Sequence, residues 1–324
     1  MDPGGRFNPF LGLRPFEERD EELFFGREEQ VDELVGRLRR RRLIAVVGTS
    51  GSGKSSLVRA GLLPALHGGF MAGAGSRWYA ATLRPGTQPI ANLAEALEAS
   101  GVLGPPEPHD EVRAGLARAA LDRGALGLVD LLRDSQVRPG DNVLIVVDQF
   151  EELFRFKQEN VNEAAAFVKL LMAAAAYPDL RLYVVLTMRS DFLGECAEFA
   201  GLPEAINDGL YLVPRMSWDQ LRRAIVGPAG VAGAEIEPAL VTRLLNDLGD
   251  NPDQLPVLQH ALMRTWDLRS DLGAAPRLGV ADYARTGRSR ARALGARRRG
   301  VRNTRRPRST ARRAPLQVHH RVRQ

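Results

Sequence analysis

The sequence has little cysteine and lacks long apolar runs. Its one cysteine, Cys196, excludes an internal disulfide framework and fits a reducing compartment, so we expect a cytoplasmic protein in which Cys196 packs against a helix. No apolar run reaches the roughly 18 residues of a membrane span. Residues 1–10 are polar and rich in Pro and Gly, unlike a signal peptide. The scattered histidines show no spacing typical of a metal site.

Acidic residues are absent after Tyr283, where the chain carries 15 arginines. Residues 1–283 therefore hold 30 Lys and Arg against 39 Asp and Glu, a net charge of −9, although the whole chain has +6. We expect an acidic folded part and a disordered basic tail over residues 284–324. Such a tail favours contact with nucleic acid or anionic lipid without sequence preference.

Hydrophobic residues make up 44% of the 324 residues, as in globular proteins. Short apolar runs alternate with segments at helical spacing, which predicts a parallel sheet covered by helices on both faces. The expected strands are 43–47, 79–83, 143–147, 182–187 and 210–213. The expected helices between them are 28–39, 90–97, 112–121, 126–132 and 164–176. Helical segments at 221–226, 238–248 and 254–266 indicate a smaller helical region.

A glycine-rich segment follows the first expected strand and opens a helical pattern. Its residues 48–55, Gly-Thr-Ser-Gly-Ser-Gly-Lys-Ser, fit the phosphate-loop pattern G-x-x-x-x-G-K-[ST] without a mismatch. In this setting backbone N–H groups wrap a phosphate chain, Lys54 reaches the β- and γ-phosphates, and the Ser55 hydroxyl binds Mg²⁺. The predicted nucleotide contacts here are Gly48, Thr49, Ser50, Gly51, Ser52, Gly53, Lys54, Ser55 and Ser56.

A second carboxylate is needed to hold Mg²⁺, and Asp148 closes the apolar strand 143–147. Hydrolysis also needs a carboxylate that orients or deprotonates water. In many related ATPases that acid directly follows the Asp, but Gln149 stands there, so the base is Glu151 or Glu152, and we favour Glu151. The alternative is that both are exposed acids opening a helix.

Arg189 follows the expected strand 182–187 and is a candidate sensor of the γ-phosphate. In the alternative interpretation, Ser190 or Asp191 caps a helix and Arg189 is a surface charge. No N-K-x-D guanine-reading motif occurs, which favours ATP over GTP.

Several further segments occur in a fixed order along the chain. They are Asn-Pro-Phe-Leu-Gly-Leu-Arg-Pro-Phe at 8–16, Phe-Phe-Gly-Arg-Glu at 24–28, Val-Asp-Gln-Phe-Glu-Glu-Leu-Phe at 147–154, Thr-Met-Arg-Ser-Asp-Phe at 187–192, and Asn-Pro-Asp-Gln-Leu-Pro-Val-Leu-Gln-His-Ala-Leu at 251–262. Together with the phosphate loop, this set resembles bacterial STAND-class NTPases of the novel STAND type, often joined to WD-repeat propellers. The resemblance covers about residues 8–283.

The resemblance implies a P-loop NTPase core at 26–213 after an irregular lead-in at 1–25, then a helical and winged-helix-like region at 214–283. It implies an ATPase switch in which ADP holds a closed form and ATP permits self-association. Phe25, Gly26 and Arg27 would line the adenine side, and Pro256 would touch the nucleotide from the helical region. The family pattern there is Gly-x-Pro, whereas Gln254 precedes Leu255 and Pro256 in this chain.

Two departures from the family pattern keep other interpretations of the function open. No sensor repeats and no effector domain are recognisable, and the acid-free tail begins where relatives continue into helical sequence. Out-of-frame reading of GC-rich DNA produces such a tail, so we suspect a truncated or frameshifted product. The alternatives to a switch are a DNA-associated oligomeric ATPase that uses a winged helix and the tail, and an inert ATP-binding fragment.

Overall fold

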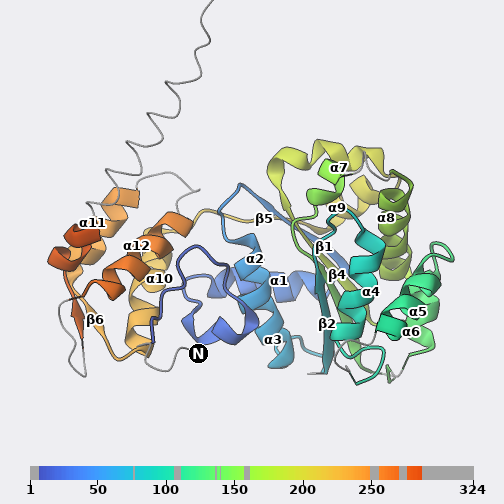
Figure 1. Cartoon of the computed structure of the whole chain (residues 1–324), viewed down its shortest axis with the longest axis horizontal. Helices are drawn as coiled ribbons and strands as arrows, with labels where there is room; N and C mark the ends of the chain where they lie inside the picture. Colours follow the sequence, from blue (N-terminus) through green and yellow to red (C-terminus); the bar gives the residue numbers. More distant parts are fainter. Residues whose placement is uncertain are drawn as a thin grey trace, which may run out of the picture.

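The computed structural model of the chain describes residues 7–75, 77–105, 111–135, 137–138, 140–156, 161–248, 255–269 and 276–286. They form a five-stranded sheet flanked by helices and a smaller helical region beside it (Figure 1). The basic tail predicted from residue 284 onward lies outside the described residues, apart from 284–286, which continue a helix that begins at 280.

The sheet is entirely parallel, with strand order β2-β3-β4-β1-β5. Helices cover both faces, so β1 and β3 are buried along their whole length, as continuous apolar strands require. This confirms the predicted α/β fold. The strands are β1 (Leu43–Gly48), β2 (Trp78–Leu83), β3 (Asn142–Val147), β4 (Leu182–Arg189) and β5 (Leu210–Leu212).

Alternate residues of β1 enter two separate cores. Ala45 and Val47 join one core, and Ile44 and Val46 join the other, because successive side chains of a strand point to opposite faces. Helices α4 (Pro89–Ala99), α5 (Glu111–Leu121), α6 (Gly127–Arg133), α8 (Val161–Ala176) and α9 (Leu202–Gly209) cover the first face. The second is covered by α1 (Glu28–Leu38), the π-helical stretch η2 (Leu57–Leu62) and α3 (Leu63–His67).

The smaller region is built on α10 (Trp218–Val231), α11 (Pro238–Leu248) and α12 (Leu255–Asp267). A capping box fixes the start of α10: Ser217 accepts from the Gln220 amide, and the Gln220 side chain accepts from the Ser217 amide. The helix continues through Pro228, beyond the expected end at residue 226. Two short strands, β6 (Glu235–Ile236) and β7 (Arg277–Leu278), pair in parallel. The winged-helix-like character of this region stays a prediction.

Residues 7–16, which we call the N-terminal strap, lie between the smaller region and α1–α3 (Figure 1). Phe10 is 2% exposed and packs edge-on against Trp266 of α12. The Asn8 amide donates to the Met263 carbonyl and to Asp267. The strap is followed by a 3₁₀ helix, η1 (Glu18–Leu23). Part of the expected irregular lead-in is therefore a packed connection between the two regions.

Two features outside the sheet bear on the predictions for Cys196 and for the basic tail. Cys196 is buried beside Met188, and burial raises the pKa of its thiol to about 11, so it packs as predicted. Arg285 donates to the Leu268 carbonyl and pairs with Asp282, which attaches the start of the predicted tail to the folded part. Within the described residues, no helix is long and apolar enough to cross a bilayer.

Candidate functional site

The phosphate loop connects the carboxyl end of β1 to the short helix α2 (Lys54–Ser56). Gly51 and Gly53 have φ values of 75° and 88°, a backbone conformation that glycine adopts without strain. The Lys54 ammonium donates to the carbonyls of Gly48 (3.0 Å) and Thr49 (2.6 Å). Burial lowers the pKa of Lys54, and the carboxylate of Glu151 opposes this shift. A largely buried cation therefore lies against the carbonyl oxygens of the loop.

Asp148 lies at the end of β3, opposite the start of α2. It is fully buried, and its Oδ1 atom accepts from the hydroxyls of Ser55 (2.7 Å) and Thr187 (2.6 Å). Its Oδ2 atom pairs with Arg59 at 2.9 Å. Because β4 lies between β1 and β3, the ends of these strands bring the loop, Asp148 and Thr187 together.

The chain turns sharply after Asp148. Gln149 has φ 57°, a conformation that is uncommon outside glycine, and its backbone N–H donates to Thr187 Oγ1 (3.0 Å). The turn leads Glu151 back toward the loop, where it is 5% exposed and accepts from the Arg189 amide (3.3 Å). Glu152 instead opens α7 (Glu152–Phe156) and accepts from the Gly86 amide (3.2 Å). The two candidate bases therefore have different surroundings. The alternative of two exposed acids is wrong, because Glu151 is buried and Glu152 is partly buried.

Arg189 ends β4, beside the strand that carries Asp148. Its guanidinium pairs with Asp191 and lies 5.8 Å from the ring centre of Phe192. Arg189 also lines the cavity described next. Asp191 thus holds Arg189, and no side-chain cap of the short helix η3 (Ser190–Phe192) is observed.

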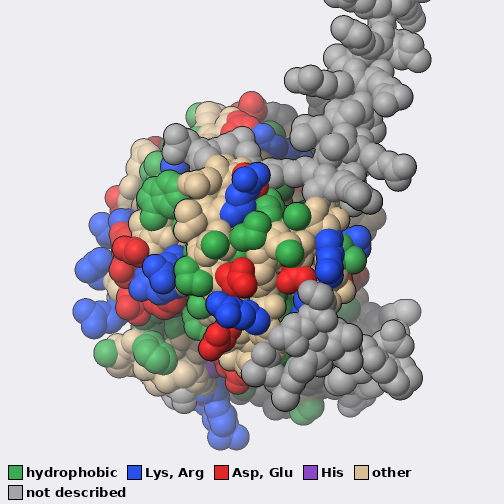
Figure 2. All heavy atoms as spheres, turned by 90° about the vertical axis from the view of Figure 1, so that its left-hand side faces the viewer, with side chains coloured by type: hydrophobic (Ala, Val, Ile, Leu, Met, Phe, Trp, Pro, Cys, Tyr) green, Lys and Arg blue, Asp and Glu red, His purple; other side chains and the backbone are tan. Residues whose placement is uncertain are grey.

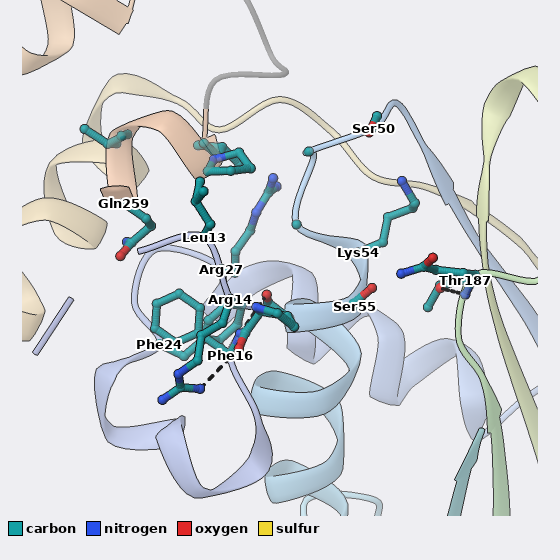
Figure 3. Close-up of a pocket in the computed structure, with 18 of the residues that line it drawn as sticks. Leu13, Arg14, Phe16, Phe24, Arg27, Ser50, Lys54, Ser55, Thr187 and Gln259 are labelled. Carbon is teal, nitrogen blue, oxygen red and sulfur yellow. Dashed lines mark hydrogen bonds between the residues drawn. The ribbon is translucent and has the colours of Figure 1, made fainter. Parts of the chain in front are cut away.

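A cavity of about 400 Å³ joins these elements to the smaller region. Lys54, Ser55 and Thr187 lie on one side of it, and Phe16, Phe24 and Gln259 lie on the other (Figure 3). The predicted site residues that line it are Phe25, Arg27, Ser50, Gly51, Gly53, Lys54, Ser55, Ser56, Glu151, Arg189 and Pro256. One half is thus polar and cationic, and the other half is mainly apolar.

Some predicted residues lie elsewhere. Gly48, Thr49 and Ser52 line a second cavity of about 490 Å³, which shares Arg27, Met216 and Leu255 with the first. Gly26 lines neither cavity, but it has φ 86°, and a Cβ there would lie 2.3 Å from the Gln220 carbonyl oxygen. It lets the chain turn so that Arg27 donates to the carbonyls of Pro214 and Ser52.

Sequence reasoning missed several residues of the site. Leu13 and Phe16 of the N-terminal strap form part of the apolar wall, and their apolar character within a Pro-rich lead-in was the available signal. Arg59 and Arg84 both approach Asp148 Oδ2, at 2.9 and 3.9 Å. No sequence motif marked these arginines, because the contacts join parts of the chain that are far apart in sequence.

The residues beside the loop fit a magnesium ion. Magnesium prefers oxygen ligands and binds through one or two carboxylates together with phosphates and water. The hydroxyl of Ser55 and the carboxylate of Asp148 supply such oxygens. Among the described residues, no group of three or more His, Cys, Asp or Glu side chains forms a protein-only metal site. The donor set therefore suits a metal that arrives with phosphates.

A parallel sheet with a phosphate loop after β1 and a buried Asp after β3 defines a P-loop NTPase. The chain belongs to the novel STAND NTPases, because the family described as Novel STAND NTPase 1 matches residues 9–312. This confirms the resemblance seen in the sequence. The match also continues past residue 283, where we expected the similarity to stop.

Solved structures are similar to this chain at low sequence identity, and one of them has a TM-score above 0.5. The ORC2 protein of Aeropyrum pernix, solved in ADPNP–ADP complexes, is 12% identical with a TM-score of 0.52, over 85% of this chain and 69% of that one. Cdc6p from Pyrobaculum aerophilum is 12% identical with a TM-score of 0.43, over 75% of this chain and 60% of that one. A Walker-type ATPase of Pyrococcus abyssi is 15% identical with a TM-score of 0.45, over 90% of this chain and 80% of that one. No curated protein matched the chain.

Proposed function

We propose that the chain is a cytoplasmic ATP-dependent switch that binds ATP and ADP with Mg²⁺, hydrolyses ATP slowly and changes conformation with the bound nucleotide. The observation that carries this proposal is the shared cavity: Lys54 and Glu151 of the core and Pro256 of α12 line the same space. Its volume of about 400 Å³ is in the range of small-molecule sites. A ligand there touches both regions, so its phosphates bias their arrangement.

In this proposal the loop amides and Lys54 bind the phosphate chain. The ammonium already lies among loop carbonyls, so it reaches the phosphates by a side-chain movement alone. Ser55 and Asp148 would hold Mg²⁺, which supplies positive charge to the β- and γ-phosphates when bound. Thr187 orients the carboxylate of Asp148 through its hydroxyl.

Glu151 is the proposed general base. Water attacks the γ-phosphorus, the bond to the β-phosphate oxygen breaks, and Glu151 accepts the proton from the water. Its place in the cavity wall supports this role, whereas Glu152 is engaged with the Gly86 amide. Closure of the cavity around the water would complete the geometry.

Arg189 is the proposed sensor of the γ-phosphate. It lines the cavity, and its guanidinium is held by Asp191, whose carboxylate is largely exposed to solvent. Exchange of this exposed partner for a phosphate costs little, because water screens an ion pair at the surface. ATP and ADP would then differ in whether Arg189 turns inward.

The apolar half of the cavity is the proposed adenine site. Phe25 packs against α10, where a Cβ on Gly227 would lie 2.4 Å from its ring. Pro256 contributes to the wall from α12. Arg27 lies in the wall as well and donates to the carbonyls of Pro214 and Ser52. An aromatic and apolar wall suits a purine ring.

Self-association in the ATP state is part of the proposal, and a DNA-associated ATPase remains the alternative that the 15 tail arginines favour. A nucleic-acid surface is normally a one-signed basic patch. On the outward face of the smaller region, acidic and basic side chains are intermixed among the described residues (Figure 2). That mixture supports the switch over broad DNA contact through this face.

Hydrogen exchange tests the switch directly. Backbone amides of α12 and of the N-terminal strap should exchange at different rates with Mg-ADP and with a non-hydrolysable ATP analogue. Amides of α8, which lies outside the cavity wall, serve as the internal control. Identical exchange in the two nucleotide states would contradict a switch while leaving nucleotide binding itself intact.

A further inference from the structure

Arg59 connects the proposed magnesium site to the segment that follows the N-terminal strap. One guanidinium nitrogen lies 2.9 Å from Asp148 Oδ2, and another lies 2.9 Å from Glu17 Oε1. The Arg59 side chain is 16% exposed and that of Asp148 is 1% exposed. A charge as buried as that of Asp148 requires a cation or several hydrogen bonds, because water cannot solvate it.

The two oxygens of Asp148 have different partners. Oδ1 faces the Ser55 hydroxyl at 2.7 Å, and this pair is the proposed magnesium side. Oδ2 faces Arg59, with Arg84 farther away at 3.9 Å. Arg59 therefore holds the oxygen that points away from the proposed metal and fixes the direction of the other one. Groups that orient a ligand in this way tune metal affinity.

The helix that carries Arg59 is unusual. Residues Leu57–Leu62 form a π-helical stretch, in which the Leu63 amide donates to the Val58 carbonyl. Such stretches are rare and are frequent at functional sites. Arg59 lies in this stretch, and its guanidinium bridges Asp148 and Glu17.

Glu17 is itself held in place from both sides. Its amide donates to Asp20 at 2.9 Å, and the preceding Phe16 amide donates to Ser56 Oγ at 3.1 Å. The strap before it continues to Phe10, which lies in the core of the smaller region. A continuous set of contacts thus runs from α12 to Asp148.

We propose that Arg59 is a positioning residue for the magnesium-binding carboxylate and that Glu17 fixes its guanidinium. Through this pair the N-terminal strap sets how strongly Mg²⁺ tightens nucleotide binding. The inference rests on the proposed function, because it needs a site that binds Mg²⁺ with nucleotide. It adds a connection that the phosphate loop alone does not supply.

The test measures the affinity of a non-hydrolysable ATP analogue by calorimetry, once with Mg²⁺ and once with EDTA. The ratio of the two dissociation constants reports the metal contribution. Arg59→Lys should reduce this ratio about 10-fold, as loss of an orienting partner does. Glu17→Gln should reduce it about 3- to 10-fold. Glu18→Gln is the matched control, since Glu18 pairs with His67 on the surface, and it should leave the ratio unchanged.

The double variant Glu17→Gln with Arg59→Lys distinguishes a relay from general damage. If Glu17 acts through Arg59, the second substitution adds little to the first, and affinity in EDTA stays near that of the wild type. Fully additive losses, or an unchanged ratio in Glu17→Gln, would overturn the link. A wild-type protein that binds no nucleotide would refute the proposed function instead.

Discussion

Replacement of Glu151 by Gln tests the proposed chemistry most sharply. The amide keeps the size of a side chain that is 5% exposed, and its oxygen still accepts from the Arg189 amide. It loses the ability to accept a proton from water. General base catalysis contributes about 10²–10⁴-fold, so phosphate release should fall at least about 100-fold while ATP stays bound.

The neighbouring Glu152→Gln variant is the matched control. Its carbonyl oxygen can still accept from the Gly86 amide, and Glu152 does not line the cavity, so turnover should change little. The assay pairs steady-state phosphate release with equilibrium ATP binding for both variants. If Glu152→Gln stops release and Glu151→Gln does not, the assignment is reversed. If neither lowers it, the chain binds nucleotide without a carboxylate base.

Three other variants test separate parts of the account. Arg189→Ala should weaken binding of an ATP analogue more than binding of ADP in calorimetry, and equal losses would mean that Arg189 is merely structural. Gly26→Ala should lower the free energy of unfolding in urea by more than about 1 kcal/mol, because φ is 86° and a Cβ would meet the Gln220 carbonyl; an unchanged value would contradict the described turn. Deletion after Thr286 should leave the melting temperature and ATP affinity unchanged, while any DNA binding that is lost should be strongly salt-dependent; a collapsed melting transition would make the tail part of the fold.

Sequence alone identified the elements with strong local signals. The continuous apolar runs of β1, β3 and β4 could be assigned because a parallel sheet buries both faces of its strands. The start of α10 was missed although Ser217 and Gln220 have capping-box spacing, and the helix continues through Pro228 beyond the expected end at residue 226. The strands β6 and β7 are two residues each, too short for any pattern to reveal.

The site was predictable only where one motif fixes the geometry. The phosphate loop is local in sequence, so its residues could be named. The different surroundings of Glu151 and Glu152 depend on the positive φ of Gln149, a conformation that no sequence pattern indicates. The contact of Arg59 with Asp148 joins residues 89 positions apart, and it depends on the packing of the whole core.

The affinity of Mg-ATP for the Lys54→Ala variant tests the central claim, that this cavity binds a nucleoside triphosphate. Lys169, exposed on α8, supplies the control variant Lys169→Ala. A charge-assisted hydrogen bond to phosphate contributes about 1.5–3 kcal/mol, so calorimetry should find binding about 10- to 150-fold weaker for Lys54→Ala and unchanged for Lys169→Ala. Unchanged Mg-ATP affinity in Lys54→Ala would contradict the account.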